Sequence, residues 1–133
     1  EFQHWLYENS DHTHQERHNK WESISMRYGT GLVDWTSYEK YQKTAWQRQL
    51  HIYEVPFYYI EYGMAQLGAI AIWRNYKQNP EKTLDDYDRA LKLGYTKTIN
   101  EIYETAGIKF DFSATHVNEL ANFVKCELEL IDN

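Results

Sequence analysis

The chain has 133 residues, enough for one domain and too few for two of ordinary size. It carries 14 Lys and Arg against 20 Asp and Glu, a net charge of −6, which argues against sequence-independent binding to nucleic acid, because such binding needs a basic surface. Aromatic residues make up 17% of the chain, so we expect a core of rings whose polar tips need partners.

Helix start signals follow one another along the first half of the chain. Residues 2–8 predict a short helix. Thr13 and Glu16 form a capping box, in which each side chain accepts a hydrogen bond from the other residue's backbone N–H. This box predicts a helix that runs to about residue 28, where Gly29 ends it. Residues 38–47 predict another helix.

Four more helices are predicted, and the residues that begin them are Pro56, Asn79, Thr98 and Ser113. The first runs to about residue 76, the second ends at Gly94 and the third at Gly107. Residues 108–112 alternate like a strand but have no partner strand, so we expect an extended connection. The predicted fold class is therefore all-α, a compact multi-helix domain over residues 1–133.

Two local features bear on whether the chain crosses a membrane and on the compartment in which it is found. Residues 56–73 are mostly apolar, but they include Glu61 and Gln66 and fall short of the roughly 20 apolar residues that cross a membrane, so we expect a core helix. The single cysteine, Cys126, excludes an internal disulfide and fits a reducing, cytoplasmic compartment, and we expect its thiol to be buried. Because the chain begins inside a predicted helix and without Met, we expect a fragment of a longer protein.

Three histidines near the first capping box could be read as a metal site. His12, His14 and His18 follow the pattern HxHxxxH, and two imidazoles one helical turn apart can bind zinc. However, the segment is not HExxH, because Glu16 is displaced by one residue and already serves as a cap partner. A solvated start of a helix is therefore favoured over a metal site.

The helix predicted to begin at Pro56 has two different faces. One is an apolar stripe, expected to be buried, of Phe57, Ile60, Met64, Leu67 and Ala71. The opposite side collects Tyr58, Tyr59, Tyr62 and Gln66. These tyrosines either complete an aromatic core with their hydroxyls at its rim or form a binding face. His51 lies just before this helix and favours the second interpretation, because a His beside tyrosine hydroxyls can stabilise an oxyanion.

At this point the chain resembles a known family, most clearly over residues 51–69, HIYEVPFYYIEYGMAQLGA. This run is similar to the signature near the C-terminus of the oligoendopeptidase F family, zinc metallopeptidases related to the thimet-type oligopeptidases. Further similar runs occur in order along nearly the whole chain, among them FQHWLY at 2–7, WQRQL at 46–50 and AGIKFDF at 106–112. So many ordered matches make the resemblance specific.

The resemblance implies the helical C-terminal part of a zinc metalloendopeptidase that hydrolyses oligopeptides. In this family, two His of an HExxH helix and a Glu on a later helix hold the zinc, and the resemblance places all three upstream of Glu1. We therefore expect no metal ligand in this chain, zinc only in the parent enzyme, and no activity from the chain alone. The implied partners are an oligopeptide substrate and the upstream catalytic region of the same polypeptide.

By the same resemblance, this chain supplies the cleft wall opposite the zinc. The family's His and Tyr that stabilise the oxyanion correspond to His51, Tyr59 and Tyr62, while Tyr58 and Gln66 are assigned to substrate binding. The loop after His51 differs in length from that of the thimet-type relatives, which leaves both Tyr58 and Tyr59 as candidates. The alternative function is a non-catalytic helical module that binds a protein or peptide through its tyrosine-rich face.

Overall fold

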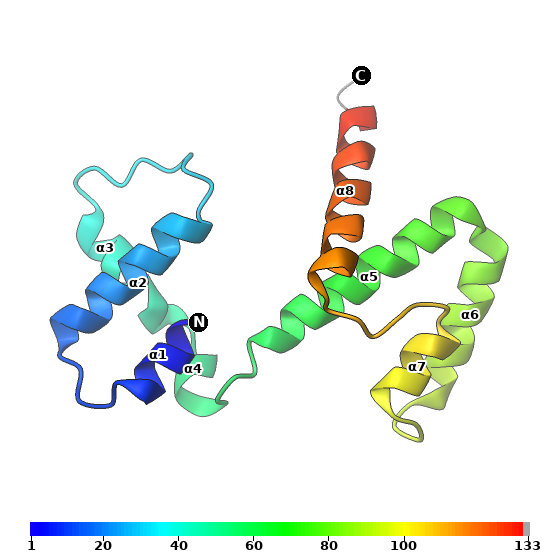
Figure 1. Ribbon diagram of the computed structural model, residues 1–133, viewed down its shortest axis with the longest axis horizontal. Coiled ribbons are helices and arrows are strands. Elements are labelled where there is room, and N and C mark those ends of the chain that lie inside the picture. The colour runs from blue at the N-terminus through cyan, green and yellow to red at the C-terminus, as the bar shows by residue number, and fades with distance from the viewer. Residues whose placement is uncertain (132–133) are drawn as a thin grey trace. The chain divides into compact units, whose positions relative to one another are not determined.

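The computed structural model describes residues 1–131, and within that range every regular element is a helix (Figure 1). The prediction of an all-α fold is confirmed. The chain divides into two compact units, the first comprising Glu1–Tyr59 and the second beginning at Ile60. Among residues 1–131 no helix has both the length and the apolar character needed to cross a membrane.

The first unit contains α1 (Phe2–Glu8), α2 (His14–Tyr28), α3 (Glu39–Thr44), a 3₁₀ turn (Ala45–Arg48) and α4 (His51–Glu54). The predicted capping box forms at the start of α2. The Thr13 hydroxyl accepts from the backbone N–H of Glu16 at 3.2 Å, and the Glu16 carboxylate accepts from the backbone N–H of Thr13 at 2.8 Å. The helix predicted over residues 38–47 is divided between α3 and the 3₁₀ turn.

Aromatic rings form the core of the first unit. The buried ring of Phe2 lies 5.1 Å from Trp21 and 5.7 Å from Trp46, measured between ring centroids. Arg17 covers Trp46 from α2, with its guanidinium carbon 5.3 Å from the ring centroid, in a cation–π contact. The core therefore connects α1, α2 and the 3₁₀ turn, and the aromatic core expected from the composition is found in this unit.

The second unit contains α5 (Ile60–Gln78), α6 (Pro80–Leu93), α7 (Ile99–Thr105) and α8 (Ala114–Ile131). Three of the predicted caps are present. The Asn79 side chain accepts from the N–H of Lys82 at 3.2 Å, Thr98 forms the second capping box, and Ser113 accepts from the N–H of His116 at 3.3 Å. These local signals set the starts of α6, α7 and α8.

Small and aliphatic side chains fill the core of the second unit. Leu120 of α8 is completely buried, and the rest of the cluster is Ala71, Ala90, Ala106 and Ile108. In Figure 1, α6 lies beside α7 and α8 crosses α5, so every helix of this unit contributes to the cluster or packs against it. Alanines at these crossings allow the helices to approach closely.

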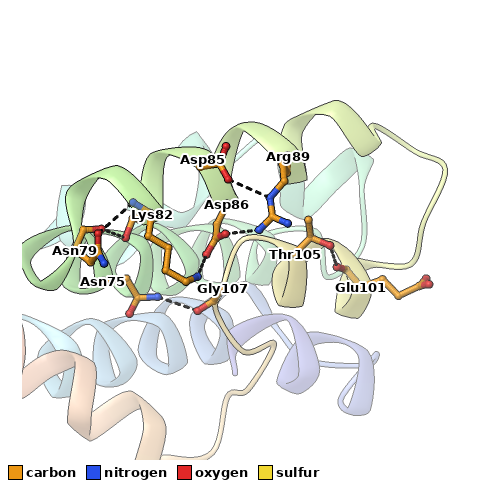
Figure 2. A network of polar contacts seen from close by, with 10 residues as sticks. Asn75, Asn79, Lys82, Asp85, Asp86, Arg89, Glu101, Thr105 and Gly107 are labelled. Carbon is orange, nitrogen blue, oxygen red and sulfur yellow. Dashed lines mark hydrogen bonds and ion pairs between the residues drawn. The ribbon is translucent and has the colours of Figure 1, made fainter.

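A polar network strengthens one side of this core (Figure 2). Asp86, which is buried, accepts hydrogen bonds from the Lys82 ammonium and the Arg89 guanidinium on the same helix. These hydrogen bonds hold the pKa of the Asp86 carboxyl below its usual value. Beside it, the Asn75 side chain donates to the carbonyl of Gly107 at 2.8 Å, which links α5 to the segment after α7.

The start of α5 differs from the prediction. The helix begins at Ile60 and not at Pro56, because residues 56–59 form a turn in which Phe57 has a φ of +60°. The Phe57 ring packs against His4 and Tyr7 of α1, with centroid distances of 4.7 and 5.3 Å. These tertiary contacts and the poor helix propensity of an aromatic run explain why the helix starts late.

The predicted burial of the apolar stripe is wrong at its first residues. Phe57 lies outside the helix, and Ile60 is 63% exposed, whereas Met64 and Leu67 are half-buried and Ala71 is buried. The prediction assumed one continuous helix from Pro56, whereas the late start of α5 leaves Phe57 outside the helix and makes Ile60 its exposed first residue.

The predicted burial of Cys126 is also wrong, because its side chain is exposed. Cys126 follows the buried Leu120 by six residues, which places it about 240° around α8 from the packed face.

Candidate functional site

The five predicted site residues belong to two different units. His51 is the first residue of α4, and Tyr58 and Tyr59 lie in the turn that follows it, all in the first unit. Tyr62 and Gln66 lie on α5 in the second unit, one turn apart on the same helix face, and both are exposed. The sequence predicted that these two residues share one helical face with Tyr58 and Tyr59. That prediction is wrong, since Tyr58 and Tyr59 precede the helix.

The His51 ring packs against both tyrosines of the turn. It stacks on Tyr58 with a centroid distance of 5.6 Å and an interplanar angle of 15°. It meets Tyr59 at 5.1 Å with an angle of 82°, an edge-to-face arrangement. His51 is half-buried, and each tyrosine is 45% exposed. The imidazole thus contacts both rings and is partly accessible to solvent.

Gln49 completes this group, and sequence reasoning did not identify it. Its side-chain Oε1 accepts a hydrogen bond from the Tyr59 hydroxyl at 2.6 Å. Ten residues separate the two, and neither lies in a regular helix, so no periodic pattern in the sequence relates them. We call Gln49, His51, Tyr58 and Tyr59 the His51 cluster.

The backbone around Gln49 is anchored to the aromatic core of the first unit. The N–H of Gln49 donates to the carbonyl of Trp46 at 3.0 Å, and the carbonyl of Gln49 accepts from the N–H of Ile52 at 3.0 Å. Trp46 is buried, and its ring stacks at 6.0 Å on Tyr53 of α4. The His51 cluster therefore rests on the 3₁₀ turn and on α4, both of which are tied to a packed ring.

The described residues do not supply a metal site. Within residues 1–131 no three His, Cys, Asp or Glu side chains are grouped so that they could hold a metal ion. Both ring nitrogens of His12 are engaged within the chain, one with the carbonyl of Asn9 and the other accepting from Arg17 Nε at 2.7 Å. The imidazole, phenol and amide groups of the His51 cluster can all form hydrogen bonds, as can the phenol of Tyr62 and the amide of Gln66 on α5.

Comparison with known proteins identifies the family. The model of peptidase family M3 matches residues 1–122. The chain belongs to peptidase family M3. An oligoendopeptidase F homologue from Borreliella burgdorferi is 31% identical to this M3 chain over 81 residues, which are 61% of this chain and 13% of the relative. No solved structure matched the chain.

Membership of the M3 family confirms the resemblance predicted from the sequence. It makes the chain part of a metallopeptidase family whose members are generally zinc-dependent. Because the chain spans only 13% of the length of the relative it matches, the M3 chain corresponds to a small part of that protein.

Proposed function

We propose that this M3 chain is the C-terminal part of a zinc metalloendopeptidase that hydrolyses oligopeptides, and that it forms one wall of the substrate cleft. The family match over residues 1–122 and the similarity to a relative named as an oligoendopeptidase F homologue support the reaction class. The observation that carries the cleft-wall role is the His51 cluster, where a half-buried imidazole is held between two part-exposed phenol rings.

The chemistry of peptide hydrolysis explains why such a wall is useful. When the scissile carbonyl is attacked, its oxygen gains negative charge, and hydrogen-bond donors aimed at that oxygen stabilise the transition state by about 3 kcal/mol each. In this proposal His51 of the first unit and Tyr62 of the second are each assigned as such a donor. A phenol suits the role because it donates without adding a charge to the cleft.

Tyr58 and Gln66 serve to bind the peptide in the proposed site. Both are exposed, and the amide of Gln66 carries a donor and an acceptor that match a peptide backbone. Gln66 follows Tyr62 by one turn of α5, so a substrate strand that reaches one can reach the other. Tyr59 belongs to the same group through its contact with His51.

The proposal is tested by Tyr62→Phe in the full-length enzyme, with steady-state kinetics on one peptide. An oxyanion donor acts when charge develops, so kcat should fall roughly 10²- to 10³-fold while KM changes little. Tyr95→Phe is the matched control, because Tyr95 is fully exposed in the loop between α6 and α7. Turnover of Tyr62→Phe at the Tyr95→Phe level would count against the proposal.

A second candidate function rests on the exposure of the same tyrosines. Tyr58 and Tyr59 are each 45% exposed and Tyr62 is 53% exposed, as expected for a surface that docks a protein or peptide without catalysis. In that case the tyrosine variants lose affinity for the bound peptide, with KM rising and kcat unchanged. The split between kcat and KM therefore separates the two functions.

A further inference from the structure

The hydrogen bond between Tyr59 and Gln49 uses the one proton that a phenol can donate. In this structure that proton points to Gln49 Oε1 at 2.6 Å. The Tyr59 ring meanwhile meets His51 in a T-shaped contact, with an angle of 82° between the two rings. Tyr59 is therefore held at its hydroxyl end by Gln49 while its ring contacts the imidazole.

A histidine needs such contacts if its N–H is to point in one direction. The second side-chain torsion of histidine is broad, so the backbone alone does not orient the ring. A donor that stabilises an oxyanion must be held within about 10–20° of the productive direction. For His51 the stacked Tyr58 ring and the nearly perpendicular Tyr59 ring both restrict the rotation of the imidazole.

We infer that Gln49 is a positioning residue for His51, an inference that rests on the proposed function. Gln49 fixes the Tyr59 hydroxyl, the fixed Tyr59 ring limits the rotation of His51, and the imidazole N–H is thereby aimed at the substrate carbonyl. The support beneath Gln49 is firm, since its backbone is hydrogen-bonded on one side to Trp46 and on the other to Ile52. Tyr59 thus acts through His51 and not by direct donation.

The experiment replaces Gln49 with a side chain of similar length that cannot accept a strong hydrogen bond, Gln49→Met, in the full-length enzyme. We expect kcat to fall about 10- to 100-fold at an unchanged KM, the scale seen when a partner that orients a functional group is removed. Gln49→Glu keeps an oxygen acceptor at the same reach and should restore most of the turnover. Gln47→Met is the matched control, because Gln47 is exposed on the same 3₁₀ turn.

A double-mutant cycle tests whether Gln49 acts through Tyr59. If it does, Tyr59→Phe lowers kcat to the same degree as Gln49→Met, and the double variant is no slower than either single one. Thermal melts of each variant exclude a loss of fold. Tyr59→Phe removes the hydroxyl that donates to Gln49 and keeps the aromatic ring in place.

Three results would overturn the inference: wild-type turnover of Gln49→Met, a double variant whose loss is the product of the single losses, or a loss in Tyr59→Phe far larger than in Gln49→Met. The last result would show that Tyr59 donates to the substrate itself. Failure of the proposed function gives a different pattern, in which His51→Ala and Tyr62→Phe also keep wild-type turnover. Loss of turnover in those two variants but not in Gln49→Met rejects the role of Gln49 alone.

Discussion

The negative charge of Asp86 contributes to the stability of the second unit. It is only 5% exposed, and its carboxylate accepts from both Lys82 and Arg89. The side chains of Lys82 and Arg89 are largely exposed, so the buried group that needs compensation is the carboxylate, and the network stabilises this unit only while the carboxyl is ionised.

The pH dependence of stability follows from the lowered pKa of Asp86. A carboxyl whose pKa is lower in the folded state stabilises the fold above its unfolded pKa, about 3.9, and loses that contribution as the pH falls through the folded value. We expect Asp86→Asn to be less stable than the wild type at pH 7, with a gap that narrows in acid below about pH 4. Urea denaturation at pH 7 and pH 3 measures the gap.

Asp85→Asn is the control for this prediction. Asp85 is the neighbouring residue, its side chain is 75% exposed, and it meets Arg89 in a surface ion pair of 3.6 Å. Its replacement should change stability little at either pH. An Asp86→Asn gap that stays constant between pH 7 and pH 3 would show that the ionised carboxylate is not what stabilises the unit.

At the scale of single helices, the two glycines of α5 give opposite predictions for the same substitution. A side-chain Cβ at Gly63 would meet nothing within 4 Å, so Gly63→Ala should stabilise the helix by up to about 1 kcal/mol through propensity. A Cβ at Gly68 would lie 2.9 Å from the Tyr103 hydroxyl and 3.2 Å from its ring. Gly68→Ala should therefore destabilise by roughly 1–3 kcal/mol, as overpacking does.

Tyr103 is held in place by its own contacts, so it cannot easily make room for a Cβ at Gly68. Its ring packs edge-to-face on Phe110 at 5.1 Å, and its hydroxyl donates to the carbonyl of Met64 at 3.4 Å. Thermal melts of the two variants side by side provide the measurement. Equal effects of the two substitutions, in either direction, would mean that Gly68 is not required for the contact between α5 and Tyr103.

The start of a helix could be predicted from the sequence where the residues that determine it lie close together in the chain. Thr13, Asn79, Thr98 and Ser113 cap their helices through residues three positions away, and the corresponding starts are where the sequence placed them. The start of α5 depends instead on Phe57 packing against His4 and Tyr7, about 50 residues earlier in the chain. No local pattern contains that information, and the predicted helix was too long for this reason.

The same distinction applies to the candidate site. The sequence indicated a histidine beside tyrosines, and the structure places His51 against Tyr58 and Tyr59. Gln49 was missed because its hydrogen bond to Tyr59 joins the residue after a 3₁₀ turn to a separate turn, with no shared periodicity. Whether these residues act on a substrate remains a prediction for the kinetic experiments.

For the molecule as a whole, membership of the M3 family shows a metallopeptidase-family part, and the role of its side chains in catalysis is our proposal. The His51 cluster carries imidazole, phenol and amide groups, and α5 carries the phenol of Tyr62 and the amide of Gln66. In the proposed enzyme, these donors act on the oxyanion and the rest of the polypeptide provides the remaining chemistry.

The oxyanion role of His51 is tested by the affinity of a phosphinic peptide inhibitor, whose charged oxygens resemble those of the tetrahedral intermediate. We measure its inhibition constant and kcat/KM for the full-length wild type and His51→Ala, with His14→Ala, an exposed position on α2, as control. The account predicts that His51→Ala weakens the inhibitor and lowers kcat/KM by the same factor, about 10²- to 10³-fold, while KM for the substrate stays unchanged. Inhibitor affinity at the level of the His14→Ala control would contradict it.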